Sequence, residues 1–241
     1  MNKSNWYGGV IMAVLSLHEI EQLVYANLKD PFTFLGAHKT WDVKVVIRAI
    51  YPAAVKVEVV NSELSIAEEM DKIHEDGLYE KLFDRNEIFD YELKITYHNG
   101  DVWQTKDSYT FLPVLSEYDT YLFNEGNHHR IYEKMGAHVI THGGVKGTHF
   151  SVWAPEAARV SVIGEFNSWD GRVSQMRMLG SSGVWELFVP KLEEGQLYRF
   201  EIKSKKGEVL LKSDPYAFFT EMRPANASVV YDINGKYEWQ D

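Results

Sequence analysis

The run of residues 165–171, Glu-Phe-Asn-Ser-Trp-Asp-Gly, has the residue types best suited to binding a ligand. It follows a predicted strand and ends in a turn, with Asn167 two positions before Trp169. An exposed indole offers an apolar ring face, and a neighbouring amide offers directional hydrogen bonds, which together suit a pyranose ring. The alternative is that Trp169 folds back and caps the protein core. The residues alone leave both interpretations open.

Catalytic and metal-binding patterns are weak. The sequence contains no G-x-S-x-G, H-E-x-x-H or P-loop motif. The glycine-rich run 142–147 leads into a predicted strand, so no helix N-terminus is available there for a phosphate. His138 and His142 have an i, i+4 spacing that could ligate zinc on a helix, but the adjacent glycines predict a turn. Adjacent carboxylates such as Glu68 and Glu69 cannot flank a sugar in a cleft. We therefore expect no catalytic residue, metal or cofactor in this chain.

Composition and charge narrow the possible partners. The chain has 241 residues, a formal net charge of −10, an aromatic content of 14% and no cysteine. The negative charge argues against nucleic acid and anionic membranes as partners, and the aromatic share favours strands or carbohydrate contact. The lack of cysteine excludes disulfides and thiol catalysis and fits a reducing compartment. The apolar run 8–17 is too short to span a membrane and lacks a signal-cleavage pattern, so we expect a cytoplasmic protein.

One helix and many strands are predicted to position these residues. Ser16 and Glu19 form a capping box, and apolar residues at helical spacing predict a helix over residues 16–28, ended by Pro31. A second short helix is expected within residues 115–124. The remaining chain has strand chemistry, with hairpin-type turns at Asp76-Gly77 and Asn99-Gly100.

The chain also contains an internal duplication. Leu35-Gly36-Ala37-His38 returns one hundred positions later as Met135-Gly136-Ala137-His138. Five further segments return at a similar offset: 46–52 as 148–155, 55–60 as 159–163, 76–79 as 182–185, 89–94 as 198–203, and 106–111 as 212–218. Each copy has about seven short strands in about 100 residues, which is typical of a β-sandwich. We therefore predict an all-β protein of two tandem β-sandwiches, over residues 1–114 and 119–241.

Several of these segments resemble the N-terminal region of bacterial glycogen branching enzymes. The runs that carry the resemblance are 30–38, 125–138, 147–155, 166–171, 211–218 and 222–224, and together they extend it over about residues 16–235. In that family, two immunoglobulin-like modules of the starch-binding type precede an α-amylase-like barrel that carries the catalytic Asp, Glu and Asp. The enzyme cleaves an α-1,4-glucan and rejoins the piece through an α-1,6 bond.

The resemblance implies that this chain is the accessory, glucan-positioning region of such an enzyme and is inactive by itself. No catalytic motif of the family falls on any residue here. The implied partners are an α-glucan, such as glycogen or a maltooligosaccharide, and the barrel of the same polypeptide. Two alternatives stay open: a free-standing glycogen-binding or scaffold module, and the front part of a related debranching enzyme.

The resemblance also implies which residues bind the glucan. Related modules stack sugar on two tryptophans, helped by a basic and a polar residue. Trp169 matches the first platform, Arg199 the basic residue and Ser228 the polar one, with Asn167 beside them. The second platform position falls on residues 208–210, which are not aromatic. In the first copy only Trp103 lies near a platform position, so each module is expected to retain about half a site.

Overall fold

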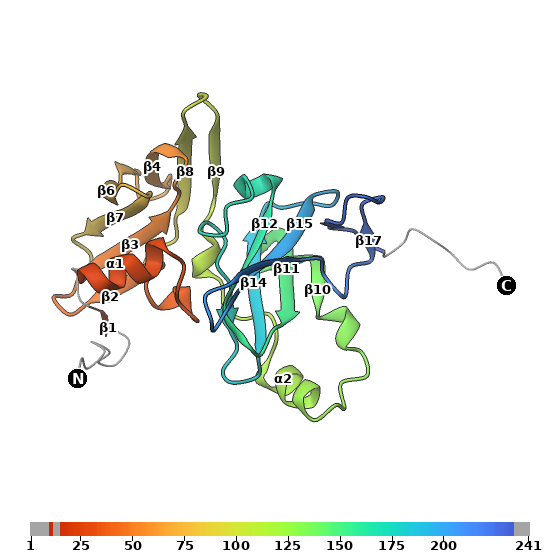
Figure 1. Ribbon diagram of the computed structural model, residues 1–241. Helices are drawn as coiled ribbons and strands as arrows, with labels where there is room; N and C mark the ends of the chain where they lie inside the picture. The colour runs from red at the N-terminus through yellow and green to blue at the C-terminus, as the bar shows by residue number, and fades with distance from the viewer. Residues whose placement is uncertain (1–9, 12–14, 234–241) are drawn as a thin grey trace. The chain divides into compact units, whose positions relative to one another are not determined.

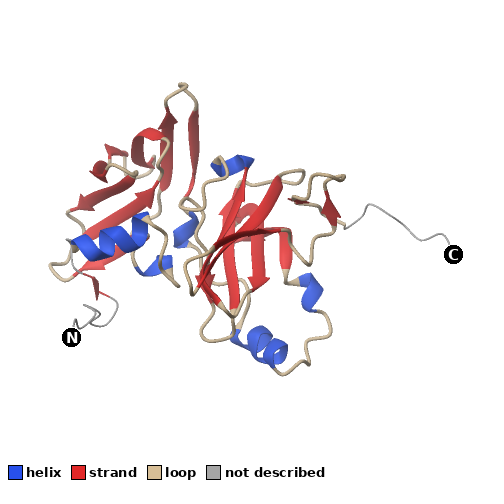
Figure 2. Ribbon diagram, in the orientation of Figure 1, coloured by secondary structure: helices blue, strands red, loops and turns tan. Residues whose placement is uncertain are grey.

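The computed structural model describes residues 10–11 and 15–233, and it divides into two compact units, Met1–Thr110 and Phe111–Asp241 (Figure 1). Half of the apolar run 8–17 lies outside the described residues. Strands predominate in both units (Figure 2), which confirms the predicted all-β class. No helix within residues 10–11 and 15–233 is long and apolar enough to cross a bilayer.

The first unit contains two sheets packed as a sandwich. One sheet has the order β1-β2-β3-β7-β6 and the other the order β5-β4-β8-β9. The pairing of β1 with β2 is parallel, and the other pairings in these two sheets are antiparallel. Ile47 of β3 and Ile95 of β8 are both fully buried in one apolar cluster, which shows that the core lies between the sheets. The strands are β1 (Val10–Ile11), β2 (Gly36–Thr40), β3 (Val45–Ile50), β4 (Ala54–Asn61), β5 (Ile66–Glu69), β6 (Asp71–His74), β7 (Leu78–Phe83), β8 (Glu92–Tyr97) and β9 (Val102–Lys106).

Helix α1 (Leu17–Val24) begins at the predicted capping box, in which the Ser16 hydroxyl accepts the N–H of Glu19 and the Glu19 carboxylate accepts the N–H of Ser16. Its buried residues pack with Leu35, Ile50 and Leu78 in a second apolar cluster of this unit. The helix ends four residues before the predicted end at Leu28. The physical reason is Ala26, which has a φ of +49° and therefore leaves the right-handed helical region.

The second unit is also a two-sheet sandwich. Its sheets have the orders β10-β11-β14-β13 and β12-β15-β18-β17, and β16 pairs with β15 beside this path. Phe150 of β11 and Tyr198 of β15 meet edge to face at 5.0 Å between the two sheets. The strands are β10 (Gly136–His142), β11 (Val145–Trp153), β12 (Ala157–Gly164), β13 (Arg177–Met178), β14 (Val184–Pro190), β15 (Leu197–Ser204), β16 (Val209–Lys212), β17 (Phe219–Thr220) and β18 (Ser228–Val229). The predicted second helix is α2 (Glu117–Asn124), and the 3₁₀ turns are η1 (Pro31–Thr33), η2 (Ser108–Thr110), η3 (Ile131–Glu133) and η4 (Glu165–Asn167).

The predicted duplication is confirmed by equivalent contacts in the two units. The N–H of Tyr51 donates to the carbonyl of Gly77 at 2.8 Å, and the N–H of Ala154 donates to that of Gly183 at the same distance. Further matched contacts are Tyr91 to Asp107 and Tyr198 to Asp214, and the rings of His38 and His138 on the carbonyls of residues 35 and 135. Even the helices correspond, because both have eight residues and start at a serine capping box, Ser16 and Ser116.

Candidate functional site

Trp169 lies in a tight loop that follows strand β12. After η4, Ser168 and Trp169 adopt left-handed conformations with φ of 55° and 58°, and the N–H of Trp169 donates to the carbonyl of Gly164 at 2.8 Å. Two consecutive non-glycine residues in this region are unusual and require support from the surrounding structure. The resulting turn leaves 38% of Trp169 exposed, so this tryptophan is not a buried cap of the core.

Asn167 supplies that support from inside the loop. Its Nδ2 donates to the carbonyl of Val162 at 2.9 Å and to Oγ of Ser174 at 3.0 Å. Its Oδ1 accepts the N–H of Gly164 at 2.9 Å, and the side chain is only 7% exposed. All its polar atoms are therefore engaged within the protein. Asn167 shapes the loop that presents Trp169 and does not face a ligand itself.

Arg199 lies beside Trp169. It is on β15, where it pairs across from Ile163 of β12, and its guanidinium carbon is 5.9 Å from the centre of a Trp169 ring. The Nε atom of Arg199 is shielded from solvent and has no hydrogen-bond partner. A guanidinium, one of whose donors is buried and unbonded, thus lies next to a half-exposed indole, an arrangement that places a cation beside an apolar face.

The charged residues around this pair neutralise one another. Arg159 Nη1 donates to Glu201 Oε1 at 2.5 Å, and Arg172 makes a forked contact with Asp170, with Nε to Oδ1 at 3.0 Å and Nη2 to Oδ2 at 2.7 Å. Burial opposes ionisation of Asp170, but the hydrogen bonds from Arg172 outweigh it and hold the pKa of Asp170 below its usual value. The surface near Trp169 is therefore polar with balanced charge, which suits a neutral ligand better than an ion.

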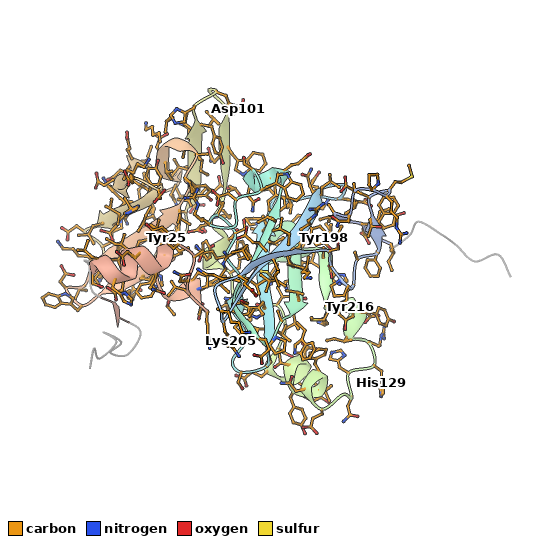
Figure 3. The ribbon with its side chains drawn as sticks, viewed as in Figure 1. Tyr25, Asp101, His129, Tyr198, Lys205 and Tyr216 are labelled. Atoms are coloured by element: carbon orange, nitrogen blue, oxygen red, sulfur yellow. The ribbon has the colours of Figure 1, made fainter. Side chains whose placement is uncertain are left out.

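Ser228 is not part of this surface. It is fully buried, and its Oγ accepts the N–H of Asp214 at 2.9 Å. Tyr198, labelled in Figure 3, donates its hydroxyl proton to Asp214 Oδ2 at 2.5 Å, and burial raises the pKa of both Tyr198 and Asp214. Ser228 therefore contributes to an interior hydrogen-bond cluster.

Trp103 belongs to the first unit, on β9 opposite Ile95, and is 50% exposed. Strand β4 of this unit ends at Asn61, whose Nδ2 donates to the carbonyl of Asp90 at 2.6 Å. Within the second unit, the structure places Trp169 and Arg199 side by side. Asn167 adjoins them from beneath, Ser228 is buried in the interior, and Trp103 belongs to the first unit.

The histidines considered as metal ligands have separate roles. The ring Nε2 atoms of His138 and His142 lie 2.9 Å from the carbonyls of Met135 and Leu112, and His149 faces Glu186. Burial lowers the pKa of His138. Over the described ranges, no three His, Asp or Glu side chains are grouped as metal ligands.

Glu186, a carboxylate with many hydrogen bonds in the described part of the second unit, was not predicted from the sequence. It is 1% exposed and accepts from Arg177 at 3.0 Å, from His149 at 3.2 Å, and from the N–H of Leu115 at 3.0 Å. The only signal in the sequence is a lone glutamate within the apolar strand Val184–Pro190. A buried carboxylate requires such partners, so this pattern could have identified a structural ion cluster.

Comparisons with known proteins agree with this division into two modules. Residues 16–109 match the family "alpha-1,4-glucan branching enzyme GlgB, N-terminal domain", and residues 134–217 match "Carbohydrate-binding module 48 (Isoamylase N-terminal domain)". Three relatives, each named 1,4-alpha-glucan branching enzyme GlgB, are similar over nearly the whole chain. The protein of Myxococcus xanthus is 45% identical over 226 residues, that of Thermosynechococcus vestitus 44% over 235, and that of Rubrobacter xylanophilus 44% over 223.

These matches cover 92%, 94% and 92% of this chain, but only 30% of each relative. The chain therefore spans about a third of the length of the curated relatives it matches. It carries the N-terminal domain typical of glucan branching enzymes, followed by a carbohydrate-binding module.

Proposed function

Since this chain carries the two N-terminal domains found in 1,4-alpha-glucan branching enzymes, we propose that it holds and positions α-glucan chains for such an enzyme. The observation that supports this proposal is the pairing of half-exposed Trp169 with Arg199 on the carbohydrate-binding module. The indole would stack on the apolar face of a glucose ring, and the guanidinium would donate to its hydroxyls.

The whole protein would transfer an α-1,4-glucan segment to form α-1,6 branches, as the names of the relatives suggest. In this proposal the chemistry belongs to the part of the relatives that this chain does not span, and the two modules contribute substrate contact. The expected ligands are glycogen and maltooligosaccharides, and the expected compartment is the cytoplasm, where glycogen is made.

The binding strength is expected to be low, because Trp169 is the sole aromatic platform of this site. We expect maltoheptaose to bind in the millimolar range, which corresponds to about 4 kcal/mol. Losing a stacked anchor typically costs about 1 to 3 kcal/mol, so Trp169→Ala should weaken binding roughly tenfold to a hundredfold. Arg199→Ala should have a smaller effect, because a guanidinium gives a neutral sugar only hydrogen bonds.

The test is a titration of the 241-residue chain with maltoheptaose, followed by amide chemical shifts. Trp153→Ala is the matched control, because Trp153 is 53% exposed in the same unit but contacts Phe123. We expect Trp153→Ala to bind as the unaltered chain does. Equal binding by the Trp169→Ala variant, in a chain shown to be folded by its spectrum, would remove Trp169 from the site and with it the basis of the proposal.

A further inference from the structure

Strand β16 is an edge strand with an apolar surface. It pairs with β15, and no other described strand lies along its outer side. Three of its four residues are aliphatic, and Val209, Leu210 and Leu211 are 53%, 42% and 53% exposed. Proteins usually protect such an edge with inward-pointing charges, proline or a bulge, since an open edge can pair with another strand.

The backbone of β16 presents a regular set of free groups on that side. Ser204 donates its N–H to the carbonyl of Glu208 at 2.8 Å, and Leu210 lies opposite Ile202 in the same ladder. In an antiparallel ladder the backbone groups of successive residues alternate in direction. Residues 208, 210 and 212 therefore face β15, and Val209 and Leu211 direct their N–H and C=O groups outward.

This edge is complementary to itself. If two copies meet antiparallel with Leu210 at the two-fold axis, Val209 of each copy lies opposite Leu211 of the other. The two outward-facing residues of each strand then exchange four backbone hydrogen bonds. The same register places Glu208 of each copy opposite Lys212 of the other, on the face that carries the two Leu210 side chains. We propose that this chain forms a two-fold symmetric dimer by pairing β16 with β16 of a second copy.

The charges select this register. Within the described chain, neither Glu208 nor Lys212 has an ion-pair partner, so both are available across the interface. Sliding the pairing by two residues in either direction moves Glu208 and Lys212 of the two copies apart, so both ion pairs are lost. Opposite charges directly across a pair of strands stabilise it, and like charges destabilise it.

The dimer is expected to be weak, because it joins two short strands. A dissociation constant on the order of 100 µM is consistent with four added backbone hydrogen bonds, two ion pairs and a small apolar contact. Glucan binding is not required for this contact, so the dimer and the glucan site can be tested separately.

Sedimentation equilibrium of the 241-residue chain over a range of concentrations tests the proposal. Glu208→Lys places two lysines opposite each other at both ends, and Lys212→Glu does the same with two glutamates. Each variant alone should associate about tenfold more weakly than the unaltered chain. An equimolar mixture of the two variants restores both ion pairs, so it should associate at least as strongly as the unaltered chain.

Asp101→Lys is the matched control. Asp101 has the equivalent place in the first unit, because its carbonyl accepts the N–H of Tyr97 as that of Glu208 accepts the N–H of Ser204. This variant has the same change of charge and should dimerise as the unaltered chain does. A chain that stays monomeric at about 1 mM, ten times the expected constant, would overturn the proposal. So would a dimer that responds equally to Glu208→Lys and Asp101→Lys, or a mixture of variants that does not associate.

Discussion

Asn167 and Trp169 show how differently two neighbouring residues can be used. Both were predicted as sugar contacts from the same short run, yet the amide is buried with every polar atom bonded and the indole is half exposed. The sequence predicted that Trp169 lies in a polar turn, and the structure shows its indole partly exposed there. The sequence could not predict that the Asn167 side chain points into the loop, because its direction depends on the left-handed conformations of Ser168 and Trp169.

The first prediction at the residue scale concerns Asn167. Replacing it with Ala would leave the N–H of Gly164, the carbonyl of Val162 and the hydroxyl of Ser174 without this partner. Buried groups left unbonded cost about 1 to 3 kcal/mol each before relaxation, so the variant should lose about 3 kcal/mol of unfolding free energy. Urea denaturation measures this loss. Asn124→Ala, at an exposed position on α2, should change stability by less than about 0.5 kcal/mol.

Asp107 provides a prediction on pH. It is 2% exposed, and burial raises its pKa to about 6, even though Tyr91 and the N–H of Tyr109 donate to it. Because the folded pKa lies above the unfolded value, stability from this group is complete below about pH 4 and is lost as pH rises through about 6. The shift of about two pH units corresponds to about 3 kcal/mol.

Asp107→Asn removes this titration while keeping an oxygen that can accept one hydrogen bond. The difference in unfolding free energy between the unaltered chain and the variant should therefore fall by about 2 kcal/mol from pH 4 to pH 6.5. Urea denaturation at a series of pH values measures it. Parallel stability curves for the two proteins would show that Asp107 is already ionised throughout this range.

At the scale of elements, strands and turns were easier to predict than the helix end. Hairpin turns at Asn99-Gly100 and Asp76-Gly77 are present because their glycines take φ of 88° and 84°, which other residues rarely adopt. The helix prediction was too long, because apolar spacing continued to Leu28 after the backbone had turned at Ala26. Periodicity reports which residues are buried, and residues beyond a helix can be buried too.

The turn before β14 gives a prediction at this scale. Gly183 has a φ of +75°, and an added Cβ would lie 2.7 Å from Cβ and 2.8 Å from Cα of Pro155. Gly180 also has a positive φ, +56°, but an added Cβ there meets open space. Both substitutions to Ala carry the conformational cost of about 1 kcal/mol, and only Gly183→Ala adds a clash with backbone. Gly183→Ala should therefore lower the unfolding free energy by at least about 2 kcal/mol more than Gly180→Ala.

Thermal or urea unfolding of the two glycine variants provides the comparison, and because each carries a positive φ, the conformational cost cancels in the difference. Equal losses for the two variants would mean that the Pro155 turn moves to admit the methyl group.

At the scale of the whole molecule, repetition made the fold predictable. Two copies of one pattern, offset by about one hundred residues, predicted two sandwiches, and the matched contacts of Gly77 and Gly183 agree with it. The segment between the copies was harder to predict, because no matched pair of the duplication covers residues 112–115. The sequence pattern assigned residues 111–114 to the first sandwich and residue 115 to neither, and their contacts in the structure show with which unit they pack.

Those contacts are with the second unit. Phe111 meets Phe188 edge to face at 4.7 Å, Leu115 is 3% exposed, and the N–H groups of Val114 and Leu115 both donate to Glu186. Burial opposes ionisation of Glu186, but its hydrogen bonds to His149 and Leu115 outweigh it and hold its pKa below the usual value. Residues 111–115 therefore supply backbone hydrogen bonds to the buried carboxylate of Glu186.

The last prediction follows from this cluster. A segment of residues 111–241 should fold by itself, whereas one that begins at the sequence-based boundary, residue 119, should be less stable by at least about 3 kcal/mol. The shorter segment loses two hydrogen bonds to a buried charge, each worth about 1.5 to 3 kcal/mol, together with the apolar contacts of Phe111 and Leu115. Thermal unfolding of the two segments measures the difference. Glu186→Gln within residues 111–241 separates the causes, since it keeps the apolar contacts and weakens only the bonds to the carboxylate. If residues 119–241 unfold at the same temperature as 111–241, the linker is dispensable and the module begins where the sequence pattern placed it.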